Sequence, residues 1–536
     1  MYPTPAYAIP NKAAAGPSRP ALVLTALQKL ALPVGAVLFD LLFWHERAGL
    51  NMLLYTVAVV VATVAGLPRY APQWRSGYTW LLLAGTLLSA GLVAWHGSGA
   101  AVLACMASLA CWLGYLNQPH LRLLSNALLT ALANAGQVVV ALPTLLRLPA
   151  NVGEKVRRSW FYGRLLLVPL MVLFLFHVLF VVANPQYETL ADHVLEVLAH
   201  WVESLFWHFS FAHVLFFVLG LALTAAALLI VPVHYFADRE SRFAEFVQRQ
   251  RNRVASFAVR QPDFRRREQR SLDLRKEYLV AVGLLGLVNV LLLVVNSVDI
   301  NWIWFGFERE PGFDLTQFVH EGTYVLIFSI LVAMGILLWF FRRNLNFYQP
   351  GLPVLRGLAT VWVLQNVVLA VSVGLRNYYY ILYTGLAYKR LGVCFFLLLV
   401  LFGLGTMLLK IWQRRSTFAL VRLNSLAAYV VLLLLAAGNW EVWIARYNLR
   451  PQLISVDYGF LLNMPDRVLP TLQAHAAELE QHRLKHQLYD GSYSRLSAVE
   501  ARATLQQRIG QFKRQQKQRH WPSYTWADWV AYQLLK

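Results

Sequence analysis

Long apolar segments recur along this chain of 536 residues, and they constrain its fold more than any other feature. A helix needs about 20 mostly apolar residues to cross the hydrocarbon core of a bilayer, which is about 30 Å thick. The segments do not alternate with the period of two that is typical of membrane barrel strands. Because a spanning segment must satisfy its own backbone hydrogen bonds, we predict an all-α fold, a polytopic bundle of transmembrane helices. About eleven spans are expected, at residues 22–43, 49–68, 77–95, 99–117, 164–184, 207–232, 278–297, 319–341, 355–374, 391–411 and 423–444.

Charge is scarce in this chain and unevenly placed. Only 14% of the residues are charged, whereas a typical soluble protein has about 25%. Lys and Arg outnumber Asp and Glu by 48 to 27, which gives a net charge of +21. In a soluble protein this excess would indicate nucleic-acid binding, but no binding motif accompanies it. The basic residues lie mainly between spans, as in cytoplasmic loops, so we expect the lipid bilayer as partner and no nucleic acid.

The chain divides into three parts. These are a polar N-terminal tail at 1–20, a transmembrane bundle at 21–444 and a C-terminal extramembrane domain at 445–536. In the last part, residues 472–479 and 498–512 have helical periodicity, and a Gly-containing turn at 489–492 separates them. We therefore predict a small helical domain, which ends in a segment rich in Trp.

Loop charges predict the orientation of the chain. The loop at 236–277 contains twelve Lys and Arg residues and is expected to be cytoplasmic, whereas the neighbouring loops at 185–206 and 298–318 are acidic and should be external. A further apolar stretch, 127–148, is interrupted by Asn, Gly, Gln and Pro. If it lies along the cytoplasmic interface, the N-terminus is inside and the C-terminus outside. If it spans, the N-terminus is outside, and the basic residues near the first spans then fit less well.

Motifs for common enzyme chemistry do not occur. The sequence has no nucleotide-binding loop, no H-E-x-x-H and no G-x-S-x-G. Its three cysteines, Cys105, Cys111 and Cys394, lie in apolar segments without C-x-x-C spacing. We therefore predict no catalytic residue, no cofactor and a non-enzymatic protein.

One acidic pattern matches the spacing of a helix face. Glu188, Asp192, Glu196 and His200 follow one another at intervals of four residues. Three carboxylates and an imidazole on one face could bind a divalent cation. The alternative, which we favour, is the solvated face of an amphipathic helix that lies on the outer leaflet.

A second group of polar residues lies near the predicted external ends of the eighth to tenth spans. Glu321 could form an ion pair with Arg376 or Arg390 there, and tyrosines surround these charges. The alternative is an aromatic belt with cations that extend to the interface. The candidate binding residues are Glu321, Arg376, Tyr383, Lys389, Arg390, Asn439 and Asp457.

Four short stretches resemble motifs of a known family. Residues 383–390 look like its Y-G-L-T-x-x-R motif, and Glu321-Gly322 looks like its E-G-F start of a span. Residues 439–448 are similar to its N-x-D-x-x-I-A-R-x-N motif. Two further stretches, 457–461 and 466–470, are similar to its D-x-x-Y-L and D-A-V-P segment.

The family is an uncharacterised bacterial membrane family, the domain-of-unknown-function family numbered forty-one seventy-three. The sequence departs from the motifs at Thr384, Ala387 and Glu441, where the family has Tyr, Thr and Asp. The resemblance implies a membrane location but no activity.

Three functions fit these observations. The first is a non-enzymatic protein of the bacterial inner membrane that acts as an envelope scaffold or binds an anionic lipid or an envelope protein. The second is a transporter or channel, for which inverted repeats would be expected. The third is a membrane-embedded transferase that acts on a lipid-linked substrate, which would need an acid or base and a metal in one pocket.

Overall fold

The computed structural model describes most of the chain. The described residues are 24–68, 70–145, 210–248, 274–305, 315–342, 344–450, 453, 455–487 and 493–536, with nine isolated positions between 169 and 197. Within this part, nine helices are long and apolar enough to cross a membrane. This confirms the predicted all-α, polytopic fold, although the expected span at 164–184 falls almost entirely outside the described residues.

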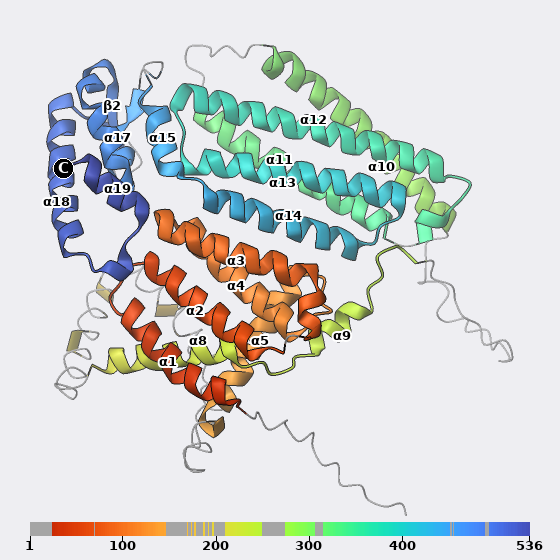
Figure 1. Cartoon of the computed structure of the whole chain (residues 1–536). Coiled ribbons are helices and arrows are strands. Elements are labelled where there is room, and N and C mark those ends of the chain that lie inside the picture. Colours follow the sequence, from red (N-terminus) through yellow and green to blue (C-terminus); the bar gives the residue numbers. More distant parts are fainter. Residues whose placement is uncertain are drawn as a thin grey trace, which may run out of the picture. The chain divides into compact units, whose positions relative to one another are not determined.

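The spanning candidates follow one another along the chain (Figure 1). They are α1 (Ala26–Phe43), α3 (Gly77–His96), α4 (Gly99–Asn117), α5 (Leu124–Leu145), α8 (Phe211–Leu228), α10 (Leu274–Asp299), α12 (Leu352–Thr384), α13 (Tyr388–Gln413) and α14 (Thr417–Ala437). Two more apolar helices are α2 (Leu50–Gly66) and α11 (Leu315–Phe340). Several begin at a serine whose side chain accepts a hydrogen bond from a free backbone N–H in the first turn, as Ser98 does for α4 and Ser416 for α14.

Helix α5 covers residues 127–145 of the interrupted apolar stretch as one continuous helix, and residues 146–148 lie outside the described part. It is long and apolar enough to span, so length alone leaves both predicted placements open. The second half of α5 packs on the end of α8. Asn134 donates to the carbonyls of Ala226 and Leu229 at 3.0 Å. Val138 and Leu142 belong to the same apolar cluster as Leu228. These contacts all involve the C-terminal end of α8. The cytoplasmic-interface placement therefore stays a prediction.

The described chain forms two compact units, and their boundary falls within α1, α2 and α5. In the first unit, the start of α1, the second half of α5 and α8 share an apolar cluster that includes Leu32, Val138 and Leu228. At the other end of the α1–α8 pair, Nε2 of His213 lies 2.9 Å from the carboxylate of Asp40. Both are polar residues of candidate spanning helices, and each provides a hydrogen-bond partner for the other.

The second unit contains the larger core. Helix α12 packs against α10, α11 and α13, and α14 packs against α13, α3 and α4 (Figure 1). Fully buried Leu285, Trp362 and Leu404 belong to the cluster between α10 and α13. Helix α10 continues into a π-helical turn at Ile300–Trp304, whose Trp304 donates to the hydroxyl of Ser372 at 3.0 Å.

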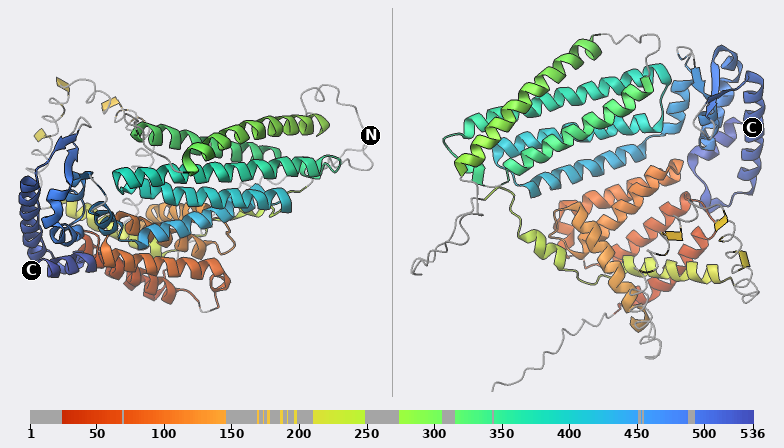
Figure 2. Two further views of the ribbon diagram at one scale, coloured as in Figure 1. Left: turned by 90° about the horizontal axis from the view of Figure 1, so that it is seen from above. Right: turned by 180° about the vertical axis from the view of Figure 1, so that it is seen from behind.

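The C-terminal region lies beyond one end of the α12–α14 helices (Figure 2). It contains α15 (Trp440–Asn448), α16 (Tyr458–Leu462), α17 (Leu469–Ala474), α18 (Ala498–Gln518), α19 (Trp526–Leu534) and several short 3₁₀ turns. Its apolar core includes Val456, Leu472, Leu505 and Phe512. Burial in this core raises the pKa of the Tyr458 hydroxyl to about 12.

This region also contains a sheet that the sequence did not predict. Strand β1 (Ser455–Asp457) pairs in parallel with β2 (Arg483–Gln487), and β2 pairs antiparallel with β3 (Tyr493–Arg495). The predicted turn at 489–492 lies outside the described residues, and the described elements on either side of it are the strands β2 and β3. Helix α18 covers the predicted helical stretch 498–512. The strands have three to five residues and largely polar sequences, too short to show an alternating pattern.

Candidate binding site

A cavity of about 340 Å³ lies in the second unit, where α3 ends, α4 begins and the C-terminal region meets them. Its wall is formed by charged side chains, hydroxyl groups and backbone atoms. Its lining residues are Arg47, Ala48, His96, Gly97, Ser98, Gly99, Glu441, Pro465, Asp466, Arg467, Arg519, Ser523, Thr525 and Asp528.

A buried ion pair forms one wall of the cavity. The Nη2 atom of Arg467 donates to Oε1 of Glu441 at 2.7 Å, and the side chains are only 6% and 9% exposed. The Nη1 atom of Arg467 donates to the carbonyl oxygen of His96, the last residue of α3. Its Nε has no hydrogen-bond partner among the residues that the structure describes. Because the arginine side chain has only donors, this N–H is left without an acceptor.

The turn between α3 and α4 forms a second wall. Gly97 ends α3 with a φ of +57°, and a Cβ atom there would lie 3.0 Å from Cγ2 of Thr525. Ser98 then caps α4 by accepting from the amide of Ala101 at 3.2 Å. The N-terminus of α4 therefore borders the cavity at Ser98 and Gly99. Helix N-termini carry partial positive charge and favour anions.

The end of the described chain closes the cavity from the other side. The hydroxyl of Ser523 donates to the carboxylate of Glu46 and accepts from the amide of Arg47 at 2.8 Å. The amide of Leu50 donates to the carbonyl of Tyr524 at 2.9 Å. These bonds join the segment before α19 to the connection between α1 and α2.

The charges of the lining favour an anion. Each of its three carboxylates has an arginine partner: Glu441 pairs with Arg467, and Arg519 lies 2.8 Å from Asp528. Asp466 pairs with Arg508, which is not part of the lining. Arg47 is exposed and has no ion pair within the described part of the chain. One cation and the N-terminus of α4 are therefore left for a ligand.

One residue of the predicted charge pair at the external rim has a partner that the sequence did not indicate. Arg376 forms a buried ion pair with Asp299, 2.6 Å from Nη2 to Oδ1. Glu321 lies in α11, but its side chain is outside the described part. Arg390 places its guanidinium 4.1 Å from the centre of the Tyr380 ring and donates to the carbonyl of Gly385. The sequence missed Asp299 because it lies at the very end of a long apolar run.

The remaining predicted residues support loops and helix ends. Asp457 caps α16 by accepting from the amide of Phe460 at 3.0 Å, and half-buried Asn439 directly precedes α15. Tyr383 and Lys389 are exposed. Among the predicted residues whose side chains are described, none lines the cavity.

Two of the stretches that resemble family motifs meet at Asn448. Its Oδ1 accepts from the amide of Leu386 at 2.6 Å, and its Nδ2 donates to the carbonyl of Leu386 at 2.8 Å. The neighbouring Gly385 has a φ of +88°, and a Cβ atom there would lie 2.6 Å from Oδ1 of Asn448. The motif glycine is therefore required by the backbone conformation and by the close approach of Asn448.

The acidic metal candidates lie mostly outside the described residues. Glu188, Asp192 and His200 are not described, and only Glu196 is described, as an exposed residue. Across the described ranges, no group of three or more His, Cys, Asp or Glu side chains could hold a metal ion. The favoured reading of this segment as a solvated helix face stays a prediction.

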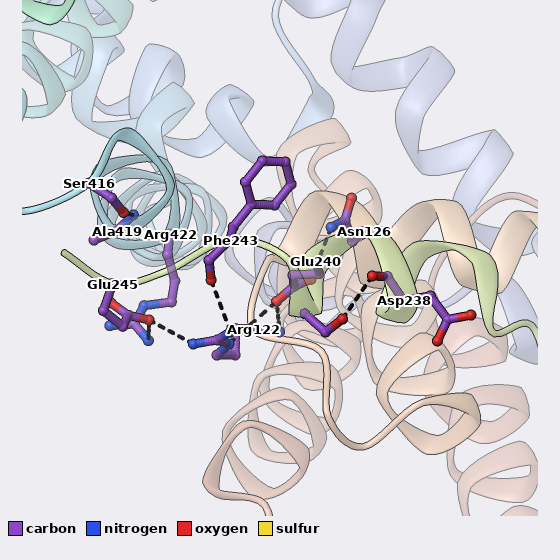
Figure 3. A network of polar contacts seen from close by, with 10 residues as sticks. Arg122, Asn126, Asp238, Glu240, Phe243, Glu245, Ser416, Ala419 and Arg422 are labelled. Carbon is purple, nitrogen blue, oxygen red and sulfur yellow. Dashed lines mark hydrogen bonds and ion pairs between the residues drawn. The ribbon is translucent and has the colours of Figure 1, made fainter. Parts of the chain in front are cut away.

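A separate polar network lies at the opposite ends of the helices (Figure 3). Oε1 of Glu245 forms ion pairs with Nη1 of Arg122 at 3.0 Å and with Nη1 of Arg422 at 2.8 Å. Buried Glu240 accepts from the amide of Arg122 and from Asn126 at 2.9 Å. The segment after α9 (Tyr235–Ser241) thus joins the α4–α5 turn to the start of α14.

The cavity residues that sequence reasoning missed had only a weak signal. Glu441 and Arg467 both lie in stretches that resemble family motifs, and each is a charged residue. Their 26-residue separation gives no indication that they pair. His96 and Ser523 carry no sequence signal, because their roles depend on contacts between distant segments.

The apolar helices and the cores between them define a multi-span helical membrane protein. The chain belongs to the family Domain of unknown function (DUF4153), whose model matches residues 34–474. This confirms the expectation of a family of unknown function, although the family number is forty-one fifty-three and not forty-one seventy-three. No curated protein and no solved structure matches the chain significantly.

Proposed function

We propose that this membrane protein binds a small ligand with a phosphate or carboxylate group in the cavity beside α3 and α4. The observation that carries the proposal is the positive charge left at the cavity wall: Arg47 is exposed without an ion pair in the described structure, and the N-terminus of α4 borders the cavity at Ser98 and Gly99. Arginine matches the planar or tetrahedral oxygens of carboxylate and phosphate, so a bidentate contact of Arg47 with such a group is geometrically favourable.

Binding without chemistry is the simplest use of this cavity. Glu441, Asp466 and Asp528 each form an ion pair with an arginine, so no carboxylate of the lining is left unpaired for a substrate. The same ion pairs hold the wall in one arrangement, and a fixed wall lowers the entropic cost of binding. The proposal therefore keeps the predicted non-enzymatic role and moves the site away from the external rim.

The proposed location is the external side of the bacterial inner membrane. Contacts within the second unit support it, because they group residues by predicted side. Arg122, Glu245 and Arg422, all predicted cytoplasmic, contact one another. Glu46 and Ser523, both predicted external, also contact each other.

The test is ligand-induced stabilisation of the full chain in detergent. Inorganic phosphate and glycerol 3-phosphate serve as soluble probes, and nanodiscs with phosphatidylglycerol, compared with phosphatidylcholine nanodiscs, serve as the lipid probe. A ligand at 100 times its Kd stabilises a protein by about 2.7 kcal/mol. Stabilisation by the soluble probes alone would identify a free anion as the ligand. Stabilisation by phosphatidylglycerol nanodiscs alone would identify a lipid headgroup.

Arg47→Gln is the decisive variant, because Arg47 is exposed and has no ion pair to lose in the described structure. We expect it to reduce the stabilisation by the active probe at least several-fold. The matched control is Arg514→Gln, an exposed arginine of α18 outside the cavity, which should respond as wild type. Equal stabilisation of both variants, or none in any arm, would contradict the proposal.

Transport is a second candidate, and the buried Asp299–Arg376 pair favours it. Ionisable residues within membrane helices often mark ion or proton paths. Asp299 directly precedes the π-helical turn at Ile300–Trp304, and such turns are frequent at functional sites. A test is proton flux into proteoliposomes that contain a pH-sensitive dye. The candidate fails if Asp299→Asn leaves that flux unchanged.

A further inference from the structure

Helix α19 exposes an apolar face. Trp526, Trp529 and Leu534 are 52%, 41% and 70% exposed, whereas Ala531 on the opposite face is buried. The helix thus has a buried side that packs on the C-terminal core and an exposed side that is mostly apolar, with Gln533 as its uncharged polar residue. A contiguous apolar face of this kind is unusual on a surface in contact with water, and it indicates an interaction site.

The position of this face relative to the membrane follows from α3. Exposed Trp80 and Trp95 lie near the two ends of α3, with exposed Leu81 and Leu88 between them. Fifteen residues of helix span about 22 Å. Tryptophan is favoured at both surfaces of a bilayer, so this stripe matches a lipid-facing helix with one Trp at each interface.

Helix α19 contacts α3 at the interface that Trp95 marks (Figure 1). The rings of Trp95 and Trp526 are 6.2 Å apart, and those of Trp526 and Trp529 are 5.0 Å apart. The three rings therefore continue the lipid-facing stripe of α3 onto α19 without a break. The charged residue of this helix, Asp528, instead pairs with Arg519.

We propose that the exposed face of α19 lies in the headgroup layer of the same bilayer and anchors the C-terminal region to it. The bilayer is the favoured occupant because the face is continuous with a lipid-facing helix and carries no charge. The buried and exposed faces of α19 would then meet protein and lipid, as in other interfacial helices. The inference is independent of ligand binding in the cavity.

The experiment uses the full chain in phosphatidylcholine vesicles, with an environment-sensitive nitrobenzoxadiazole probe on a single cysteine. Exposed Cys394 is first replaced by Ala, since Cys105 and Cys111 are buried. The probe is placed at Leu534→Cys, and Trp529→Cys provides a second position on the same face. Quenching by lipids spin-labelled near the headgroup is compared with quenching by an aqueous nickel complex.

The face should be quenched several-fold more strongly by the lipid quencher than by nickel. The matched control is Gln511→Cys on the exposed polar side of α18, for which the order should reverse. Nickel quenching at 534 and 529 equal to that at 511 would overturn the proposal. Protection from both quenchers would also overturn it, because a protein would then cover the face.

Discussion

At the scale of single residues, the Glu441–Arg467 pair is the most demanding feature of the second unit. Both side chains are nearly fully buried, and Arg467 also holds the carbonyl oxygen of His96. Two buried charges are tolerated only while each neutralises the other. The pair thus links α15, the end of α3 and the turn before α17 through one guanidinium.

Removal of one partner should therefore destabilise the protein strongly. We expect Glu441→Gln to lower the free energy of unfolding by about 3–5 kcal/mol, because it leaves the buried charge of Arg467 uncompensated. The measurement is unfolding of the purified protein in detergent. The control is Glu480→Gln, which loses only the exposed pair with Arg502 and should cost at most about 1 kcal/mol. Similar losses in both variants would contradict the role of burial.

Two glycines provide a second test at this scale. Gly385 has φ +88° and ψ 178°, a region that only glycine occupies readily, and Asn448 leaves no space for a Cβ atom. We expect Gly385→Ala to destabilise the protein by at least about 1–3 kcal/mol. Gly392→Ala lies inside α13 with open space around it and should be neutral or stabilising. Equal thermal unfolding of the two variants would show that the Gly385 conformation is not required.

At the scale of elements, α18 shows how a polar helix outside the membrane is fixed at its start. Ser497 and Glu500 form a reciprocal capping box: Oε2 of Glu500 accepts from the amide of Ser497 at 2.9 Å, and the hydroxyl of Ser497 accepts from the amide of Glu500 at 3.2 Å. These hydrogen bonds favour the carboxylate and lower the pKa of Glu500. The cap is therefore sensitive to acid.

The sign of this sensitivity is fixed by the direction of the shift. Glu500 binds a proton more readily in the unfolded chain than in the folded one. Its contribution to the free energy of unfolding is therefore present above about pH 4.3 and is lost as the pH falls further. We expect the thermal unfolding midpoint of the wild-type protein to be higher than that of Glu500→Gln at pH 6. This difference in midpoint temperature should be smaller at pH 3. A difference that stays constant between the two pH values would contradict the assignment.

At the scale of the whole molecule, the orientation in the membrane is the main open prediction. Within the second unit, the cavity is lined by residues that are predicted to be external, and the ion pairs of Glu245 with Arg122 and Arg422 join residues that are predicted to be cytoplasmic. A cysteine at Glu480 should therefore react with an impermeant thiol reagent from outside intact cells. A cysteine at Arg242, also exposed, should react only after lysis.

These labelling experiments again use a chain with Cys394 replaced by Ala, because that native cysteine is exposed. Labelling of position 242 in intact cells would reverse the whole orientation, including the placement of the cavity. Protection of position 480 would do the same.

The sequence predicts the helical part of this fold well, because each spanning helix corresponds to one continuous apolar stretch of the sequence. The apolar runs that became α3, α4, α12 and α13 could be read directly, since lipid requires long apolar helices. The polar sheet β1–β2–β3 could not be read, because its strands are short and depend on pairing across distant segments.

The cavity shows the same limit for the candidate site. Rim residues such as Arg390 were selected because charge near the end of a span is visible locally, yet Arg390 turned out to stack on Tyr380. Arg467 and His96 are 371 positions apart, and nothing in either segment indicates their contact. Sites that several distant segments build together are invisible to local patterns.

The bond between Glu46 and Ser523 has a consequence for the order of assembly. Its partners are 477 positions apart in the chain, so the first helices are made and inserted long before the hydroxyl of Ser523 exists. Until then, the mostly buried carboxylate of Glu46 lacks this partner, and the cavity lacks the wall that Ser523, Thr525 and Asp528 provide. During biosynthesis the cavity is thus among the last features to close, and a nascent chain that stalls before residue 523 would reach the membrane with its helices in place and its cavity still open.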